Sequence, residues 1–314
     1  MNTINATFKT HFGDDARAFT VIAPGRVNLI GEHVDYNAGL VLPIAISRRT
    51  LLRVRPRDDR RVILFAAQFD ETREFSLDAI SHQNAWIDYV QGVAAELEKR
   101  FSLRGFEGVI ESDVPMASGL SSSAALEVGA ALAFLQVGEY SLAPREVALL
   151  CQKAENGFIG VNSGIMDQMA VAACQKNHAL LLDCRSLETE QIPFLLRSEN
   201  REYSLIVTDS GAPRELASSA YNERRAQCEL GLKILREKLS HIETLRDVSP
   251  EELACYENLL PEVVRRRVRH VVEEIARTKS AVESLRQGDL VAFGARMNES
   301  HDSLRDLYEV SSSE

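Results

Sequence analysis

Two polar stretches interrupt apolar sequence in the first 130 residues, and their residue types are suited to binding and chemistry. The first runs from Pro24 to Gly39 and reads PGRVNLIGEHVDYNAG. Apolar residues flank it on both sides, as expected of buried strands. Polar groups are costly to bury unless they are partnered, so we interpret this stretch as a wall of a small-molecule site.

The second stretch, Val114 to Ala125, reads VPMASGLSSSAA. A strand is expected to end before it and a buried helix to begin at Ser121. The free N–H groups of a helix N-terminus bind anions, and Gly119 lets the backbone approach a phosphate. Four serines lie between Ser118 and Ser123, more than the alternative, an ordinary serine cap, requires. We predict a phosphate-binding loop, which lacks the G-x-x-x-x-G-K-[ST] pattern of a Walker loop.

The surrounding pattern predicts the elements that position these stretches. A change in composition near residue 190 divides the chain into an N-terminal domain, 1–190, with both stretches, and a C-terminal domain, 191–314. The expected elements are strands between 20 and 67 and over 108–111, 179–184 and 203–209, helices over 84–100, 121–137 and 144–157, and mainly helix from 214 onward.

The composition narrows the class of protein. A net charge of -10 argues against a general nucleic-acid binder. Five cysteines without a C-x-x-C spacing argue against disulfides or zinc, and suit a reducing compartment. The sequence shows no apolar signal core and no apolar run of about 18 residues, so we expect no membrane partner and a cytoplasmic location. The basic run Arg265–His270 is interpreted as a solvated helix face.

The segment P-x-x-x-G-L-S-S-S-A resembles the phosphate loop of the GHMP small-molecule kinases, and alone it would also fit mevalonate or homoserine kinases. The first stretch matches fewer families than the loop does, because G-R-V-N-L-I-G-E-H-x-D-Y-N-x-G resembles the galactokinase signature. Segments 154–156, 164–168 and 221–228 agree with it. The resemblance implies an α+β fold of two lobes with the active site in the cleft between them. It also implies ATP-dependent phosphorylation of galactose at its C1 hydroxyl.

The resemblance also implies a role for each matching residue. Asp167 matches the catalytic aspartate, and Arg26 the arginine beside the transferring phosphoryl group. Ser123 and Glu155 match the Mg²⁺ ligands. Trp86 and Tyr89 match aromatic positions near the adenine, although a core role suits them almost equally. The residues that match nucleotide-binding positions are Ala117, Ser118, Gly119, Leu120, Ser121, Ser122 and Ser123. The residues that match sugar-binding positions are Glu32, His33, Val34, Asp35, Gly164 and Tyr221.

Two departures from the family pattern qualify these expectations. Position 34 is valine where threonine is usual, so one hydroxyl is lost. A third, glycine-rich family motif is absent, which predicts an incomplete second domain and reduced or absent activity. An impaired truncated kinase, a non-catalytic galactose and ATP sensor, and a kinase for a related sugar therefore remain as alternatives. The expected partners are galactose and ATP, and the expected state is a monomer.

Overall fold

The computed structural model describes residues 2–14, 16–198, 201–208 and 217–311. They form two compact units, the first comprising 1–27 and 45–173 and the second comprising 28–44 and 174–314. The chain therefore passes between the units three times, and the first of these passages splits the Pro24–Gly39 stretch. The predicted single boundary near residue 190 stays a prediction.

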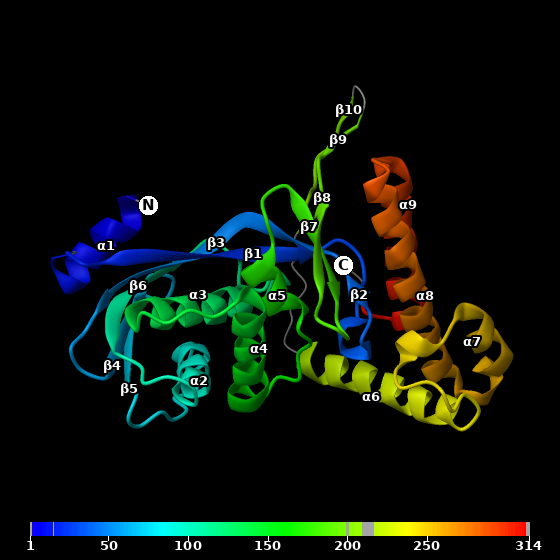
Figure 1. The fold of residues 1–314 in the computed structure, drawn as a ribbon, viewed down its shortest axis with the longest axis horizontal. Coiled ribbons are helices and arrows are strands. Elements are labelled where there is room, and N and C mark those ends of the chain that lie inside the picture. The colour runs from blue at the N-terminus through cyan, green and yellow to red at the C-terminus, as the bar shows by residue number, and fades with distance from the viewer. Residues whose placement is uncertain (1, 15, 199–200, 209–216, 312–314) are drawn as a thin grey trace. The chain divides into compact units, whose positions relative to one another are not determined.

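A five-stranded sheet forms the frame of the first unit, in the order β1-β3-β6-β4-β5 (Figure 1). Strand β6 pairs antiparallel with β3 and parallel with β4. Strand β5 was not predicted, because its sequence ETREFS is mostly polar; it lies at the sheet edge, where only Phe75 is buried. The strands are β1 (Phe19–Asn28), β3 (Pro43–Pro56), β4 (Arg61–Ala66), β5 (Glu71–Ser76) and β6 (Phe106–Ser112).

Helices cover both faces of this sheet. Alternate strand residues point to opposite faces, so Leu52 and Leu64 join the main core while Leu51 and Phe65 pack under α1. Helix α3 is buried almost all round, as its sequence predicted, and Figure 1 shows it with α2 and α4 on one side of the sheet. The helices are α1 (Asn2–Phe12), α2 (Ile87–Glu98), α3 (Ser122–Val137), α4 (Pro144–Ala154) and α5 (Met166–Ala173), with a π-helical turn at Glu155–Ile159.

The second unit combines a small sheet with long helices (Figure 1). Its three-stranded sheet has the order β2-β7-β8, and β9 pairs with β10. Helix α8 packs against both α6 and α9. The strands are β2 (Leu40–Val41), β7 (His178–Asp183), β8 (Thr189–Pro193), β9 (Arg197–Ser198) and β10 (Arg201–Glu202). The helices are α6 (Ala217–Arg236), α7 (Pro250–Tyr256), α8 (Glu262–Arg286) and α9 (Leu290–Ser303), with short helical turns at Asp35–Asn37, Leu245–Asp247, Glu257–Leu259 and Leu304–Tyr308.

The prediction of a buried strand over 203–209 was wrong for its described part, 203–208. This segment has no regular structure, and Ile206 is 80% exposed. An apolar run becomes a strand only where another strand supplies hydrogen-bond partners, and no described strand pairs with it. Residue 209 lies outside the described residues. Among the helices that the structure describes, none is long and apolar enough to cross a membrane.

Candidate active site

Arg26 and Asp167 form a bidentate ion pair in the first unit. The guanidinium Nε donates to Oδ1 at 2.8 Å, and Nη2 donates to Oδ2 at 2.7 Å. Their side chains are only 12% and 31% exposed. The third guanidinium nitrogen, Nη1, donates to the carbonyl of Gly119, while the backbone N–H of Arg26 donates to the carbonyl of Leu120. Arg26 therefore ties together strand β1, the predicted phosphate loop and helix α5.

The predicted phosphate loop leads directly into helix α3. Ser121 is the N-cap residue, yet its side chain makes no capping bond to the helix. Its hydroxyl instead donates to Oδ2 of Asp167 at 2.6 Å. Ala117, Gly119 and Ser121 all have positive φ, which turns the backbone sharply here. The first N–H groups of α3 are left without a side-chain cap, an arrangement that favours an anion.

Glu155 lies at the end of α4, opposite the first turn of α3. Its Oε1 is 3.4 Å from the Ser123 hydroxyl, and its Oε2 accepts from Gln168 Nε2 at 2.9 Å and from the Ser163 hydroxyl. Burial raises the pKa of Glu155, although these hydrogen bonds favour its charged form. Gln168 also donates to the buried Glu127, whose pKa is raised further by burial and by the Glu155 charge. Sequence reasoning missed Gln168 and Glu127.

The pair Ser123 and Glu155 fits a magnesium ion in part. Both offer oxygen ligands, which magnesium prefers, and their oxygens face each other across a short gap. Among the described residues there is no group of three or more His, Cys, Asp or Glu side chains able to hold a metal. An ion here would take its other ligands from nucleotide phosphates and water.

A cavity of about 220 Å³ adjoins the start of α3. The Trp86 ring stacks at 6.4 Å on Phe69, and its indole N–H donates to Glu71. Trp86 also packs against the main core, so the two interpretations of this residue are compatible. The cavity thus joins flat apolar walls to the helix N-terminus. Its lining residues are Thr50, Ala66, Gln68, Phe69, Trp86, Tyr89, Ile110, Ser112, Met116, Ser122, Ser123 and Leu126.

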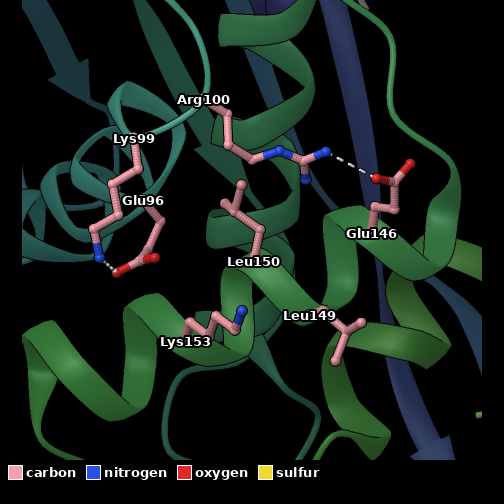
Figure 2. A pocket seen from close by; sticks show the side chains of 7 residues that line it. All are labelled: Glu96, Lys99, Arg100, Glu146, Leu149, Leu150 and Lys153. Atoms are coloured by element: carbon pink, nitrogen blue, oxygen red, sulfur yellow. Dashed lines mark hydrogen bonds and ion pairs between the residues drawn. The ribbon is translucent and has the colours of Figure 1, made fainter.

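A second pocket, of about 330 Å³, is also in the first unit (Figure 2). Arg100 is paired with Glu146 at 2.9 Å, and Lys99 with Glu96 at 2.5 Å. Two of its three cations are therefore already neutralised, and it shares no residue with the first cavity. Its lining residues are Glu96, Lys99, Arg100, Glu146, Leu149, Leu150 and Lys153.

Most of the predicted sugar-binding residues lie in the second unit. Glu32, His33 and Val34 form a loop that ends in the helical turn beginning at Asp35. The loop starts at Gly31, whose φ is +96°; a Cβ there would collide with the Leu40 carbonyl, so this position requires glycine. Val34 is fully buried. Gly164 is in the first unit, two residues before α5 begins at Met166.

A chain of side-chain contacts continues from His33. Its Nδ1 is 2.9 Å from the Tyr36 hydroxyl, which is 2.7 Å from the Tyr308 hydroxyl, and Tyr308 contacts Cys228 Sγ at 3.2 Å. The ring of Tyr221 lies 5.8 Å from that of His33. Burial, with the nearby charges of His270 and Arg224, lowers the pKa of His33 to about 3. The imidazole is therefore neutral at pH 7.

The basic run on α8 is not simply a solvated face, so that prediction was wrong for two of its residues. Arg267 is 2% exposed, and His270 is fully buried, as is Glu274 one turn further along. Arg267 donates to the carbonyl of Leu307. The spacing 267, 270, 274 places all three on one helix face, among the valines that mark the core. That spacing fits a buried face, but charged residues on a helix are most often solvated, so the sequence alone did not single these three out.

Comparisons with known proteins identify the relatives of this chain. Residues 6–56 match the galactokinase galactose-binding signature, and residues 88–175 match the GHMP kinases N terminal domain. A galactokinase of Chloroflexus aggregans is 47% identical over 100% of this chain and 80% of its own length. One of Roseiflexus sp. is 45% identical over 97% of this chain and 77% of its own length.

Solved structures show the same likeness. The crystal structure of Lactococcus lactis galactokinase complexed with galactose has a TM-score of 0.90 and 37% identity, covering 98% of this chain and 80% of that one. The Methanococcus jannaschii mevalonate kinase has a TM-score of 0.58 at 16% identity, over 94% of this chain and 80% of that one. This second likeness is one of fold alone.

Proposed function

Because the chain belongs to the galactokinase family, we propose that it transfers the γ-phosphoryl group of ATP to the C1 hydroxyl of galactose. The observation that carries the proposal is the Arg26–Asp167 pair, held against the phosphate loop at the start of α3. Family membership supplies the substrates, and this arrangement supplies groups of the right kind for phosphoryl transfer.

Asp167 is the residue proposed to meet the C1 hydroxyl. Its carboxylate is fixed by Arg26 on one side and by the Ser121 hydroxyl on the other. A carboxylate held in this way can accept the hydroxyl proton or orient the hydroxyl toward phosphorus. The Arg26 guanidinium adds a positive charge where negative charge develops during transfer. Correct placement of the two reactants provides much of the remaining acceleration.

The nucleotide is proposed to bind at the start of α3. Residues 117–123 offer backbone N–H groups and serine hydroxyls to the phosphates, and the cavity beside Trp86 and Tyr89 takes the adenine. Ser123 and Glu155 are proposed to hold magnesium. When bound, that ion would offset the charge of the phosphate oxygens. Gln168 keeps the Glu155 carboxylate turned toward Ser123.

Galactose is proposed to bind the loop Glu32–Asp35 in the second unit. Glu32 and Asp35 supply carboxylates, which accept hydrogen bonds from neighbouring sugar hydroxyls and so distinguish their stereochemistry. His33 is neutral and has one ring N–H to donate. Tyr221, beside His33, supplies a further wall.

ADP release in the presence of Mg²⁺, ATP and one sugar at a time tests this function. The panel consists of galactose, N-acetylgalactosamine, glucose and mannose. We expect galactose to give the highest kcat/KM, by at least tenfold over glucose, which differs in one hydroxyl orientation. Saturable galactose binding without ADP release would contradict the catalytic proposal. A preference for another sugar would contradict the substrate assignment.

A further inference from the structure

Helix α8 holds both peptide groups of Glu32. Glu274 Oε1 accepts from the backbone N–H of Gly31 at 2.9 Å and from that of Glu32 at 3.2 Å. On the other side, His270 Nε2 lies 3.1 Å from the carbonyl oxygen of Glu32. These contacts join residues more than 230 positions apart in the chain, within the second unit.

The loop that they hold is one that the chain does not adopt readily by itself. Gly31 has a φ of +96°, and His33, a residue with a Cβ, has a φ of +59°. A left-handed conformation in a non-glycine residue is unfavourable and persists when surrounding contacts hold it in place. The backbone direction at Glu32 sets where its carboxylate and the neighbouring His33 ring point. Glu274 and His270 together form a clamp on this loop. The clamp therefore acts on Glu32 and His33, the two side chains proposed to meet the sugar.

The partners of Glu274 and His270 show that the clamp is fully built. Ser300 Oγ of α9 donates to Glu274 Oε1 at 2.6 Å, and Arg277 neutralises the other carboxylate oxygen. His270 Nδ1 lies 2.8 Å from Ser303 Oγ. A neutral imidazole satisfies both of its contacts at once when Nε2–H donates to Glu32 and Nδ1 accepts from Ser303. Each buried polar atom of the clamp named here thus has a partner.

We propose that Glu274 and His270 are positioning residues for galactose, which hold the Gly31–Glu32 peptide groups so that Glu32 and His33 face the sugar. The inference rests on the proposed function. A merely structural role would lower stability and the active fraction, leaving the affinity of the remaining folded molecules unchanged. A positioning role changes the affinity for galactose and spares the affinity for the nucleotide, whose proposed site is built from other residues.

Glu274→Gln is the direct test, with Glu273→Gln as its matched control. The amide keeps one acceptor oxygen but loses the ion pair with Arg277. The groups that hydrogen-bond to Glu274 Oε1 are all donors, so the NH₂ group of the amide finds no acceptor among them. Glu273 is the preceding residue on the same helix, is 41% exposed and lies 3.8 Å from Arg277. Calorimetry with galactose, and separately with a non-hydrolysable ATP analogue, measures both affinities on the full chain.

We expect Glu274→Gln to weaken galactose binding about tenfold or more, with the affinity for the ATP analogue within about twofold of the original chain. Glu273→Gln should change neither. An unchanged galactose affinity in folded Glu274→Gln protein overturns the proposal. If that variant does not fold, Ser300→Ala, which removes one donor to the same oxygen, decides in its place: about threefold weaker galactose binding supports the clamp, and no change overturns it. Failure of the original chain to bind galactose at all would overturn the proposed function itself.

Discussion

Asp167 is the residue whose replacement separates chemistry from binding. Asp167→Asn keeps the shape of the side chain and removes the charge that Arg26 and Ser121 now hold. We expect kcat to fall by about 10²–10⁴-fold, because the amide can neither take the hydroxyl proton nor orient it equally well. The galactose dissociation constant should stay within about threefold. Asp70→Asn, at an exposed turn of the same unit, should leave both quantities unchanged.

If Asp167→Asn protein retains more than about a third of the original kcat, Asp167 has no role in the chemical step. Steady-state kinetics with galactose and calorimetry on the same preparation give the two quantities. Protein that has lost galactose affinity as well would show that Asp167 contributes to binding the sugar or to the fold, and not to the chemical step alone.

Among single residues, those that belong to a continuous motif could be predicted from the sequence. The serine loop and the Glu32–Asp35 segment are continuous in the chain, so their residue types and spacing can be recognised in the sequence alone. Glu274 and His270 cannot be recognised in that way, because their role comes from a tertiary contact with residues more than 230 positions away. A charged residue on a helix is most often solvated, and only packing shows which ones are not.

At the scale of elements, periodicity predicted most of the frame. The buried helix α3 was plain from its composition, because apolar residues surround it. Strand β5 was not predicted, because an edge strand needs few apolar residues. The prediction of a strand over residues 203–208 was wrong, because this apolar run has no described strand as a partner. Both errors concern pairing between strands, which local pattern does not specify.

The packing of α6 against α8 gives a test at this scale. A Cβ on Gly231 of α6 would collide with Val268 of α8, whose branched side chain has little freedom to move. Gly231→Ala should therefore lower the free energy of unfolding by about 1–3 kcal/mol. Gly294→Ala on α9 meets nothing within 4 Å, and should raise it by about 0.5–1 kcal/mol through helix propensity. Urea unfolding measures both, and equal effects of the two substitutions would contradict the helix packing described.

For the molecule as a whole, the buried histidines couple stability to pH. Burial lowers the pKa of His270 to about 4, even though Glu274 opposes that shift and Arg277 and Arg267 add to it. An unfolded histidine titrates near 6.5, so below that pH the unfolded chain takes up a proton that the folded chain does not. The contribution is fully present above about pH 6.5 and is lost as the pH falls toward about 4.

The expected slope is about 1.4 kcal/mol per pH unit for one such group. His270→Gln keeps a donor for the Glu32 carbonyl and removes the titrating group. We expect the unfolding free energy of this variant to depend less steeply on pH, by about half a proton at pH 6.5 and by close to one proton at pH 5. Urea unfolding at several pH values measures the slope. Parallel curves for the two proteins would show that His270 is not held neutral.

The bond that the whole chain forms as a catalyst is the most direct measure of what the protein does. Phosphorus NMR of a reaction containing the protein, Mg²⁺, ATP and galactose identifies the product without reference to any site residue. We predict galactose 1-phosphate as the one new sugar phosphate, formed in equal amount with ADP. The absence of any sugar phosphate, or phosphate found on C6 in place of C1, would contradict it.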